Sequence, residues 1–425
     1  MLQRLLRNSI LLKYGYLFRY YLKIFILTFR EQGGKEALKK VIKKTLPKIG
    51  EYKESERKFL KENYLPFFDQ AIPKKLNLII IITDTQIDQC LTYRINQKIV
   101  FFEKLGYSVI KFSSSQIGKI KSFSKIAKVA IIYRTSMSEV MVEHLKINFV
   151  KVYFEFDDLV VGRELLDYSG IKASLNTSQT INIEKESVEL ENTALLCDEI
   201  IVSTNELHDI YKKNSHSLKG KKINVINNYL VRENFSEAGV KKYDFAFTTP
   251  SLSIGPELEL INVFFQRLNS NLLKGINNKR VLVVGNKAAH EFLSKKGLDR
   301  IEFIYTGYLE YEEYIKILKN VAYVLVPLTD LNFNKSKTAI RAYDSLLAGA
   351  IPLVSPVGEY SNFMSSSGLD SLVVKGNDWL AAADKIDSYE ENYLSILSLA
   401  QEKIKKVYGW DSAKTEYLRF LYENS

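Results

Sequence analysis

The stretch richest in possible chemistry is residues 334–356, NKSKTAIRAYDSLLAGAIPLVSP. Lys337, Arg341 and Asp344 are spaced at i, i+4 and i+7, which places them on one stripe of a helix. Two cations at a helix N-terminus can bind phosphate, because that end also carries unpaired N–H groups. A carboxylate one turn later can accept hydrogen bonds from hydroxyl groups. The alternative is a solvated helix face with an Arg–Asp pair worth ~0.2–0.5 kcal/mol, and the spacing alone leaves both open.

Apolar runs predict the strands that position this stretch. Residues 76–84, LNLIIIITD, are typical of a parallel strand buried on both faces. Ten later segments have strand patterns and alternate with helical ones: 107–112, 128–135, 151–158, 197–204, 222–228, 243–249, 279–286, 301–307, 322–328 and 350–356. This alternation predicts an α/β fold with two facing Rossmann-like domains and a linker at 227–239. Because ligands of open α/β sheets bind at the carboxyl ends of the strands, we expect the site in the cleft between them.

Other charged residues stand near the predicted strand ends. Arg134 closes segment 128–135, and Arg94 lies on the helix after the first strand. Either could bind a phosphate group, or form an ordinary surface salt bridge. Asp157 and Asp158 end segment 151–158. One of them could act as a base or contact a substrate, and the alternative is a turn or helix cap, where Asp is common.

Residues 341–355 resemble the donor-site signature of GT-B glycosyltransferases, particularly the family-4 group of bacterial surface polysaccharide synthesis. That signature is a helix of the form K-x-x-E followed by Gly, Pro and Ser. Arg341 falls at the Lys position and Asp344 at the Glu position. In the family the acidic residue binds the donor ribose and the cation lies near the phosphates. A second glutamate, which contacts the donor sugar in the family, corresponds to Ser336 here.

The resemblance covers residues 77–415. FEFDDLV, with Asp157 and Asp158, is similar to a D-D-D-L turn of related transferases, and residues 90–109 resemble their first helix, where an arginine faces the cleft. TTPSLSIGPEL lies where the family carries a glycine-rich phosphate loop. The positions of the residues and the resemblance together give three sets of expected site residues. They are Asp157, Asp158 and Arg134 for catalysis; Ser253, Gly255, Lys337, Arg341 and Asp344 for donor binding; and Arg94 for the acceptor or cleft.

The resemblance also implies a domain organisation and an activity. The expected segments are a basic helical extension (1–65), an acceptor domain (66–235), a donor domain (236–400) and a C-terminal helix that returns to the first domain (401–425). The expected activity is transfer of a hexose or deoxyhexose from a nucleotide-diphosphate sugar to a growing, lipid-linked cell-surface glycan. Retention of configuration and independence of metals and other cofactors are implied as well. The alternative is a non-catalytic GT-B-like scaffold of a polysaccharide assembly complex, which Ser336 and the reduced glycine loop favour.

The positive charge of the chain is concentrated at its start. Residues 1–50 hold 12 Lys and Arg against two Glu, so ten of the eleven net positive charges lie there. The rest of the chain is nearly neutral, which argues against nucleic acid as a partner. Basic residues among Leu, Phe and Tyr suit a helix lying on an anionic membrane, and no uncharged run is long enough to cross one. We therefore expect a cytoplasmic protein at the inner face of the cell membrane, the alternative being a protein-docking arm.

Cysteine and histidine are sparse. Cys90 and Cys197 stand far apart, and neither they nor the four histidines have the spacing of a metal or redox site. Two cysteines in a chain of this length are typical of a reducing compartment. The sequence thus predicts neither a zinc enzyme nor a Cys–His hydrolase.

Overall fold

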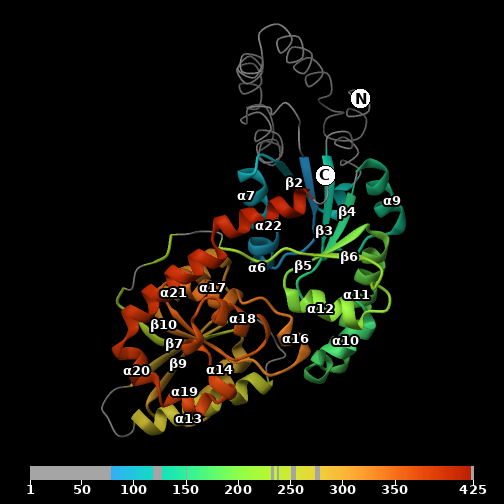
Figure 1. Cartoon of the computed structure of the whole chain (residues 1–425). Coiled ribbons are helices and arrows are strands. Elements are labelled where there is room, and N and C mark those ends of the chain that lie inside the picture. Colours follow the sequence, from blue (N-terminus) through green and yellow to red (C-terminus); the bar gives the residue numbers. More distant parts are fainter. Residues whose placement is uncertain are drawn as a thin grey trace, which may run out of the picture. The chain divides into compact units, whose positions relative to one another are not determined.

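Figure 1 shows a computed structural model of the chain. The structure describes residues 78–117, 127–149, 151–230, 234–236, 239–249, 255–272 and 278–422. The extension predicted to bind a membrane, residues 1–65, lies outside the described residues. Within them, no helix combines the length and the apolar character needed to cross a bilayer.

The described strands form two sheets (Figure 1), with strand orders β2-β1-β3-β4-β5-β6 and β11-β10-β7-β8-β9. The first contains β1 (Leu78–Ile82), β2 (Ser108–Phe112), β3 (Ala127–Tyr133), β4 (Lys151–Glu155), β5 (Glu199–Val202) and β6 (Lys222–Val225). The second contains β7 (Tyr243–Thr248), β8 (Lys279–Val284), β9 (Ile301–Thr306), β10 (Val321–Val326) and β11 (Ile351–Val354). Every strand pair of the second sheet is parallel, as are β1–β2, β1–β3 and β5–β6. Each predicted strand segment contains a strand, which confirms the two-sheet α/β prediction.

Helices connect the strands. In the first half they are α6 (Asp88–Cys90), the π-helix η1 (Leu91–Asn96), α7 (Gln97–Lys104), α9 (Glu139–Asn148), α10 (Arg163–Ser169), α11 (Thr177–Leu196) and α12 (Asn205–Asn214). In the second half they are α13 (Gly255–Leu272), α14 (Lys287–Ser294), α15 (Tyr311–Leu318), α16 (Asn332–Lys335), α17 (Ile340–Leu347) and α18 (Gly358–Ser366). The chain continues with α19 (Trp379–Ala383), α20 (Ile386–Glu391), α21 (Tyr393–Tyr408) and α22 (Trp410–Tyr422). Short 3-10 turns stand at Ser114–Gln116, Ile171–Ser174, Asp370–Leu372 and Lys375–Asn377.

By its contacts the chain divides into two compact units. One contains the described residues of 1–84 and 102–153, and the other contains those of 85–101 and 154–425. All contacts used below for the candidate site lie within the second unit. The domain boundaries expected at residues 65, 235 and 400 stay a prediction.

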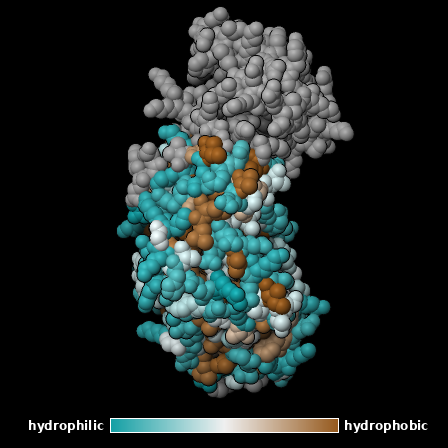
Figure 2. Space-filling view, turned by 90° about the vertical axis from the view of Figure 1, so that its right-hand side faces the viewer, coloured by the Kyte–Doolittle hydropathy of each residue, from teal (hydrophilic) through white to brown (hydrophobic). Residues whose placement is uncertain are grey.

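Each sheet is buried by apolar side chains on its faces. Every residue of β1, LIIII, is at most 1% exposed, as expected for a parallel strand covered on both sides. The second sheet carries an aromatic cluster in which Phe245 of β7 packs against Phe264, Phe265 and Tyr323. Burying one such side chain contributes ~1.5–3 kcal/mol. On the face shown in Figure 2, hydrophobic side chains gather in small groups among hydrophilic ones.

Two glycines shape the connections around the stretch 334–356. Gly349 ends the turn after α17 with φ of 78°, a left-handed conformation that lets the chain enter buried strand β11. Gly358 begins α18 with φ of 52°, and a Cβ there would lie 2.1 Å from the carbonyl oxygen of Lys335. Only glycine allows this close approach, so Gly358 sets how α18 meets the end of α16.

Candidate functional site

The carboxylate of Asp344 lies in a buried hydrogen-bonded group. Asp344, on α17, is only 1% exposed. The hydroxyl of Tyr311 on α15 donates to Oδ1 at 2.8 Å, and the hydroxyl of Tyr93 on η1 donates to the same oxygen. The two hydroxyl oxygens are 3.2 Å apart and the rings meet edge to face. Within the part of the chain that the structure describes, no group donates to Oδ2, which leaves that oxygen as an acceptor.

Burial changes the acidity of this group. It raises the pKa of Asp344 to about 7, while the hydrogen bonds from Tyr93 and Tyr311 act in the opposite direction. Burial and the carboxylate also raise the pKa of both tyrosines well above the usual value, so both hydroxyls keep their protons and donate. Asp344 therefore gains its full negative charge only as the pH rises past neutrality.

Two cations lie at the start of α17. Arg341 donates from Nη1 to the carbonyl of Thr248 at the end of β7, at 3.2 Å. The ammonium of Lys337 lies 4.5 Å from the ring centroid of Phe333. Burial lowers the pKa of Lys337, Asp158 raises it and Arg341 lowers it further. Lys337, Arg341 and Asp158 therefore share one electrostatic environment, and the structure brings these three predicted site residues together.

The predicted start of the helix in residues 334–356 is wrong. We expected one helix from about Ser336 that would carry Lys337, Arg341 and Asp344 on one stripe. Instead α16 ends at Lys335 and α17 begins at Ile340, so Lys337 lies in the connection between them. The break arises where Ser336 is completely buried and its carbonyl accepts a hydrogen bond from Thr204 at 3.2 Å.

Ser336 cannot replace the family's sugar-binding glutamate in this structure. Its hydroxyl donates to the carbonyl of Phe333 at 2.8 Å, within the same turn. A different carboxylate lies nearby. Glu257, in the first turn of α13, accepts from Asn334 at 3.0 Å and Thr329 at 3.1 Å, and its charge also acts on Lys337.

Arg94 is a buried structural residue here and not a cleft residue open to an acceptor. It is 1% exposed and donates to Glu155 at 2.7 Å and to the carbonyl of Ile226 at 2.8 Å. The ammonium of Lys98, one turn later, donates to the same Glu155 oxygen at 2.7 Å. Burial lowers the pKa of Lys98 to about 8, with Arg94 as the next cause. The arginine was expected in the cleft because residues 90–109 resemble a family helix whose arginine faces the cleft, but the Arg94 side chain is buried in the interior.

The other predicted catalytic residues lie at strand ends, as expected. Asp157 and Asp158 follow β4 and are partly exposed. The carbonyl of Asp157 accepts from Ser203 at 3.2 Å, and that of Asp158 accepts from the Val160 N–H at 2.9 Å. Arg134 belongs to the first unit, where it follows β3 with φ of 41°. For a non-glycine residue this conformation is strained, as is often found at functional positions.

The predicted phosphate loop is only partly described. Ser253 lies outside the described residues. Gly255 is the first residue of α13 and is exposed. Across the described ranges, no three His, Cys, Asp or Glu side chains are grouped as metal ligands.

Comparison with known proteins rests on structure. No protein-family model matches the chain, and no curated protein matches its sequence. An alpha-glucosyltransferase solved with UDP and mismatched DNA superposes with a TM-score of 0.55 at 12% identity, over 82% of this chain and 100% of that one. OtsA superposes with a TM-score of 0.51 at 9% identity, over 82% of this chain and 99% of OtsA. The chain has the GT-B fold.

Among the similar structures is also TarM, of S. aureus, at 14% identity and a TM-score of 0.47. The match to TarM covers 72% of this chain and 57% of TarM. This chain therefore spans little more than half of the length of TarM.

Within this GT-B fold, three residues escaped the sequence analysis. Tyr93 and Tyr311 contact Asp344, and Glu257 lies near Lys337. The only available signals were weak: Tyr93 precedes Arg94, and Glu257 stands two residues after Gly255. Nothing in the local sequence links either tyrosine to an aspartate more than 30 positions away.

Proposed function

We propose that the chain is a glycosyltransferase that moves a sugar from a nucleotide-diphosphate sugar to a glycan. The observation that carries the proposal is the pair of cations Lys337 and Arg341 around the N-terminus of α17, with the carboxylate of Asp344 further along the same helix. In the proposed complex the ribose hydroxyls donate to Asp344 Oδ2, and the diphosphate lies against the two cations. The GT-B fold, shared with an alpha-glucosyltransferase that was solved with UDP, supports this assignment.

The proposed chemistry is positioning and charge stabilisation. When the bond between the sugar and the diphosphate breaks, negative charge grows on the departing diphosphate. Lys337 and Arg341 would stabilise that charge. We assign Asp158, whose charge already acts on Lys337, to the acceptor side. We also propose retention of configuration, without a requirement for a metal.

The proposed acceptor is a growing, lipid-linked cell-surface glycan. The support is the charge of residues 1–50, which suits a protein held at an anionic membrane where such an acceptor is presented. Donor binding and membrane binding are separate parts of the proposal and can be tested separately.

The test is thermal stabilisation of the purified protein by UDP, GDP, dTDP, ADP and CMP. A bound nucleotide stabilises by RT ln(1 + [L]/Kd), so one nucleotide should raise the melting temperature in a saturable manner. Arg341→Ala and Asp344→Asn should each weaken that nucleotide's binding at least ~10-fold, since each removes a charge-assisted contact. Arg280→Ala, which removes an arginine half-exposed on β8, is the matched control and should bind normally.

The alternative of a non-catalytic scaffold predicts a different result. If no nucleotide stabilises the protein, the transferase proposal is wrong. With a binding nucleotide identified, hydrolysis or transfer from its sugar conjugates, in buffer with and without EDTA, would test the reaction itself.

A further inference from the structure

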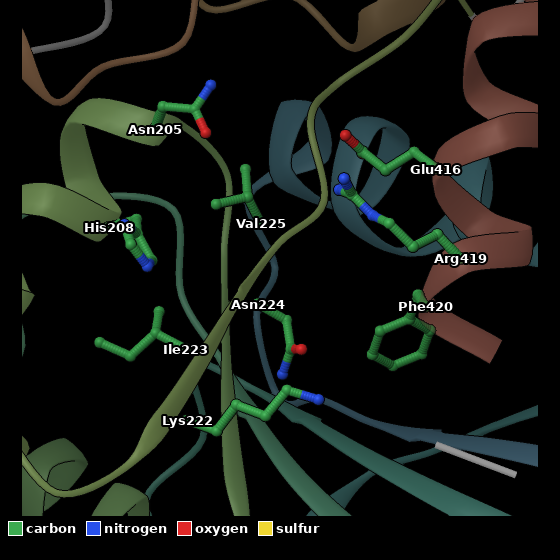
Figure 3. A pocket seen from close by; sticks show the side chains of 9 residues that line it. All are labelled: Asn205, His208, Lys222, Ile223, Asn224, Val225, Glu416, Arg419 and Phe420. Atoms are coloured by element: carbon green, nitrogen blue, oxygen red, sulfur yellow. The ribbon is translucent and has the colours of Figure 1, made fainter. Parts of the chain in front are cut away.

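A pocket of about 280 Å³ lies among residues that the donor proposal does not use. It is lined by α12, the strand β6 and the last helix α22 (Figure 3). In Figure 3, Glu416, Arg419 and Phe420 project from α22 toward β6, while Asn205 and His208 stand on α12 at the opposite side. The lining is therefore mainly polar, with one aromatic ring.

Arg419 forms no ion pair among the described residues, although its positive charge acts on Glu416 at a longer distance. Glu416, three residues earlier on α22, is its nearest candidate partner along the helix. Both carboxylate oxygens of Glu416 are, however, held by Asn227, whose N–H donates at 2.7 Å and whose Nδ2 donates at 2.8 Å. Within the described chain no acceptor lies in hydrogen-bond reach of the Arg419 guanidinium, which is exposed to solvent. A planar guanidinium in this situation is suited to a carboxylate or phosphate ligand.

The opposite parts of the pocket add polar groups. Lys222, at the start of β6, is 45% exposed and forms an ion pair with Glu199 at 3.6 Å. His208 uses Nδ1 for Asp209 at 2.8 Å, which leaves Nε2 for a ligand. The Asn224 amide donates to Glu199 and to the Ile200 carbonyl, so its oxygen is left as an acceptor.

The position of β6 provides main-chain groups as well. Among the described strands, β6 is the edge of the first sheet. β6 pairs with β5 in parallel, and the Ile226 N–H donates to the Val202 carbonyl. In a parallel pair only every second residue directs its N–H and C=O groups to the neighbouring strand, and in β6 these residues include Asn224. Ile223 and Val225, which line the pocket, therefore direct their N–H and C=O groups to the open edge.

We propose that this pocket binds an anionic sugar unit, with its carboxylate or phosphate on Arg419 and Lys222. The hydroxyl groups would use His208, Asn224 and the open edge of β6. The volume lies just below the range of ~300–1,000 Å³ for small-molecule sites, which fits one sugar residue and not a long chain. The proposal does not depend on the donor site or on transferase activity.

The test is direct binding to the full chain, by calorimetry or ligand-observed NMR, of four probes: glucuronate, glucose phosphate, glucose and inorganic phosphate. We expect at least one of the two anionic sugars to bind at least ~10-fold more tightly than both glucose and inorganic phosphate. A preference for glucuronate or for glucose phosphate would distinguish a carboxylate from a phosphate ligand. Arg419→Ala should weaken that binding at least ~10-fold, and Arg419→Lys should weaken it less.

Lys414→Ala provides the matched control, because Lys414 is an exposed cation on the same helix outside the pocket. It should bind the anionic sugar like the wild type. Circular dichroism of each variant establishes folding, and His208→Ala tests the opposite wall. Equal binding of inorganic phosphate and the anionic sugars would overturn the proposal, as would equal binding by Arg419→Ala and the wild type. Nucleotide stabilisation, measured on the same samples, reports on the donor site separately.

Discussion

At the scale of single residues, the carboxylate of Asp344 affects both the stability of the fold and the proposed binding of the donor. A buried carboxylate is costly unless it is hydrogen-bonded, and here two tyrosine hydroxyls reach the same oxygen. Its raised pKa means that the folded protein holds a proton that the unfolded chain would release. Ionisation of Asp344 therefore costs folding free energy, although the ionised form is the better acceptor for ribose hydroxyls.

The first prediction concerns pH. The pKa of Asp344 rises from 3.8 to about 7 on folding, so between these values the folded state binds more protons and stability falls as the pH increases. The fall is at most ~1.4 kcal/mol per pH unit and ends above the folded pKa. In Asp344→Asn this contribution should disappear. Denaturant unfolding across this pH range measures the contribution. Burial also raises the pKa of Glu359, to about 8, so Glu359 adds a separate decrease in stability with pH. Glu359→Gln, which removes only that second decrease, is the control. Identical pH profiles for the wild type and Asp344→Asn would contradict the prediction.

The second prediction concerns the tyrosine hydroxyls. Tyr93→Phe leaves Asp344 with one donor fewer and should lower the free energy of unfolding by ~1–3 kcal/mol at neutral pH. Tyr323→Phe is the matched control, because the buried Tyr323 hydroxyl has no hydrogen-bond partner among the described residues. Its removal should be neutral or stabilising. Equal losses in the two variants, measured by urea unfolding, would show that the contact with Asp344 is not the cause.

At the scale of elements, the site depends on two irregular features. A π-helical turn, η1, carries both Tyr93 and Arg94, and places one at Asp344 and the other at Glu155. Such turns are frequent at functional positions. The second feature is the broken helix α16–α17, which leaves Lys337 in a connection held by Ser336 and Thr204.

The third prediction tests the contact between α16 and α18. Gly358→Ala places a Cβ 2.1 Å from the Lys335 carbonyl oxygen, so the backbone must move. We expect a loss of more than ~2 kcal/mol in unfolding free energy, together with weaker nucleotide binding as Lys337 shifts. Gly297→Ala has a similarly positive φ, 66°, but no atom within 4 Å of the added Cβ, and should cost only ~1 kcal/mol. A loss for Gly358→Ala no greater than that for Gly297→Ala would indicate that α18 adjusts freely.

At the scale of the whole molecule, the net positive charge is concentrated in the first 50 residues of the sequence. The 375 residues after position 50 carry one net positive charge, whereas the first 50 carry ten. A chain organised in this way can use one segment for attachment and the rest for chemistry.

The fourth prediction follows from that separation. The full chain should bind vesicles containing an anionic lipid but not neutral vesicles, and added salt should release it, because exposed charges are screened. A variant lacking residues 1–50 should lose vesicle binding and keep nucleotide stabilisation. Co-sedimentation measures the first property and thermal shift the second. Vesicle binding that survives the deletion would place the membrane contact elsewhere.

The sequence by itself determined the strands and the fold class. A continuous apolar run such as LIIII in β1 is stable only when the strand is buried on both faces. Such runs therefore predicted where strands form. The placement of Arg341 and Asp344 on one helix also followed from local spacing, although the break between α16 and α17, which leaves Lys337 outside that helix, did not.

Only the tertiary structure decided what each charged side chain contacts. Arg94 turned inward to Glu155, and Asp344 received hydroxyls from Tyr93 and Tyr311, residues 251 and 33 positions away. Neither contact has a periodic signal, because it depends on which helices pack together. The pocket at Arg419 is likewise formed by α22 together with α12 and β6, which stand far earlier in the chain. Hydrophobic periodicity specifies an element and its buried face, but partners for polar groups are fixed only when the elements are assembled.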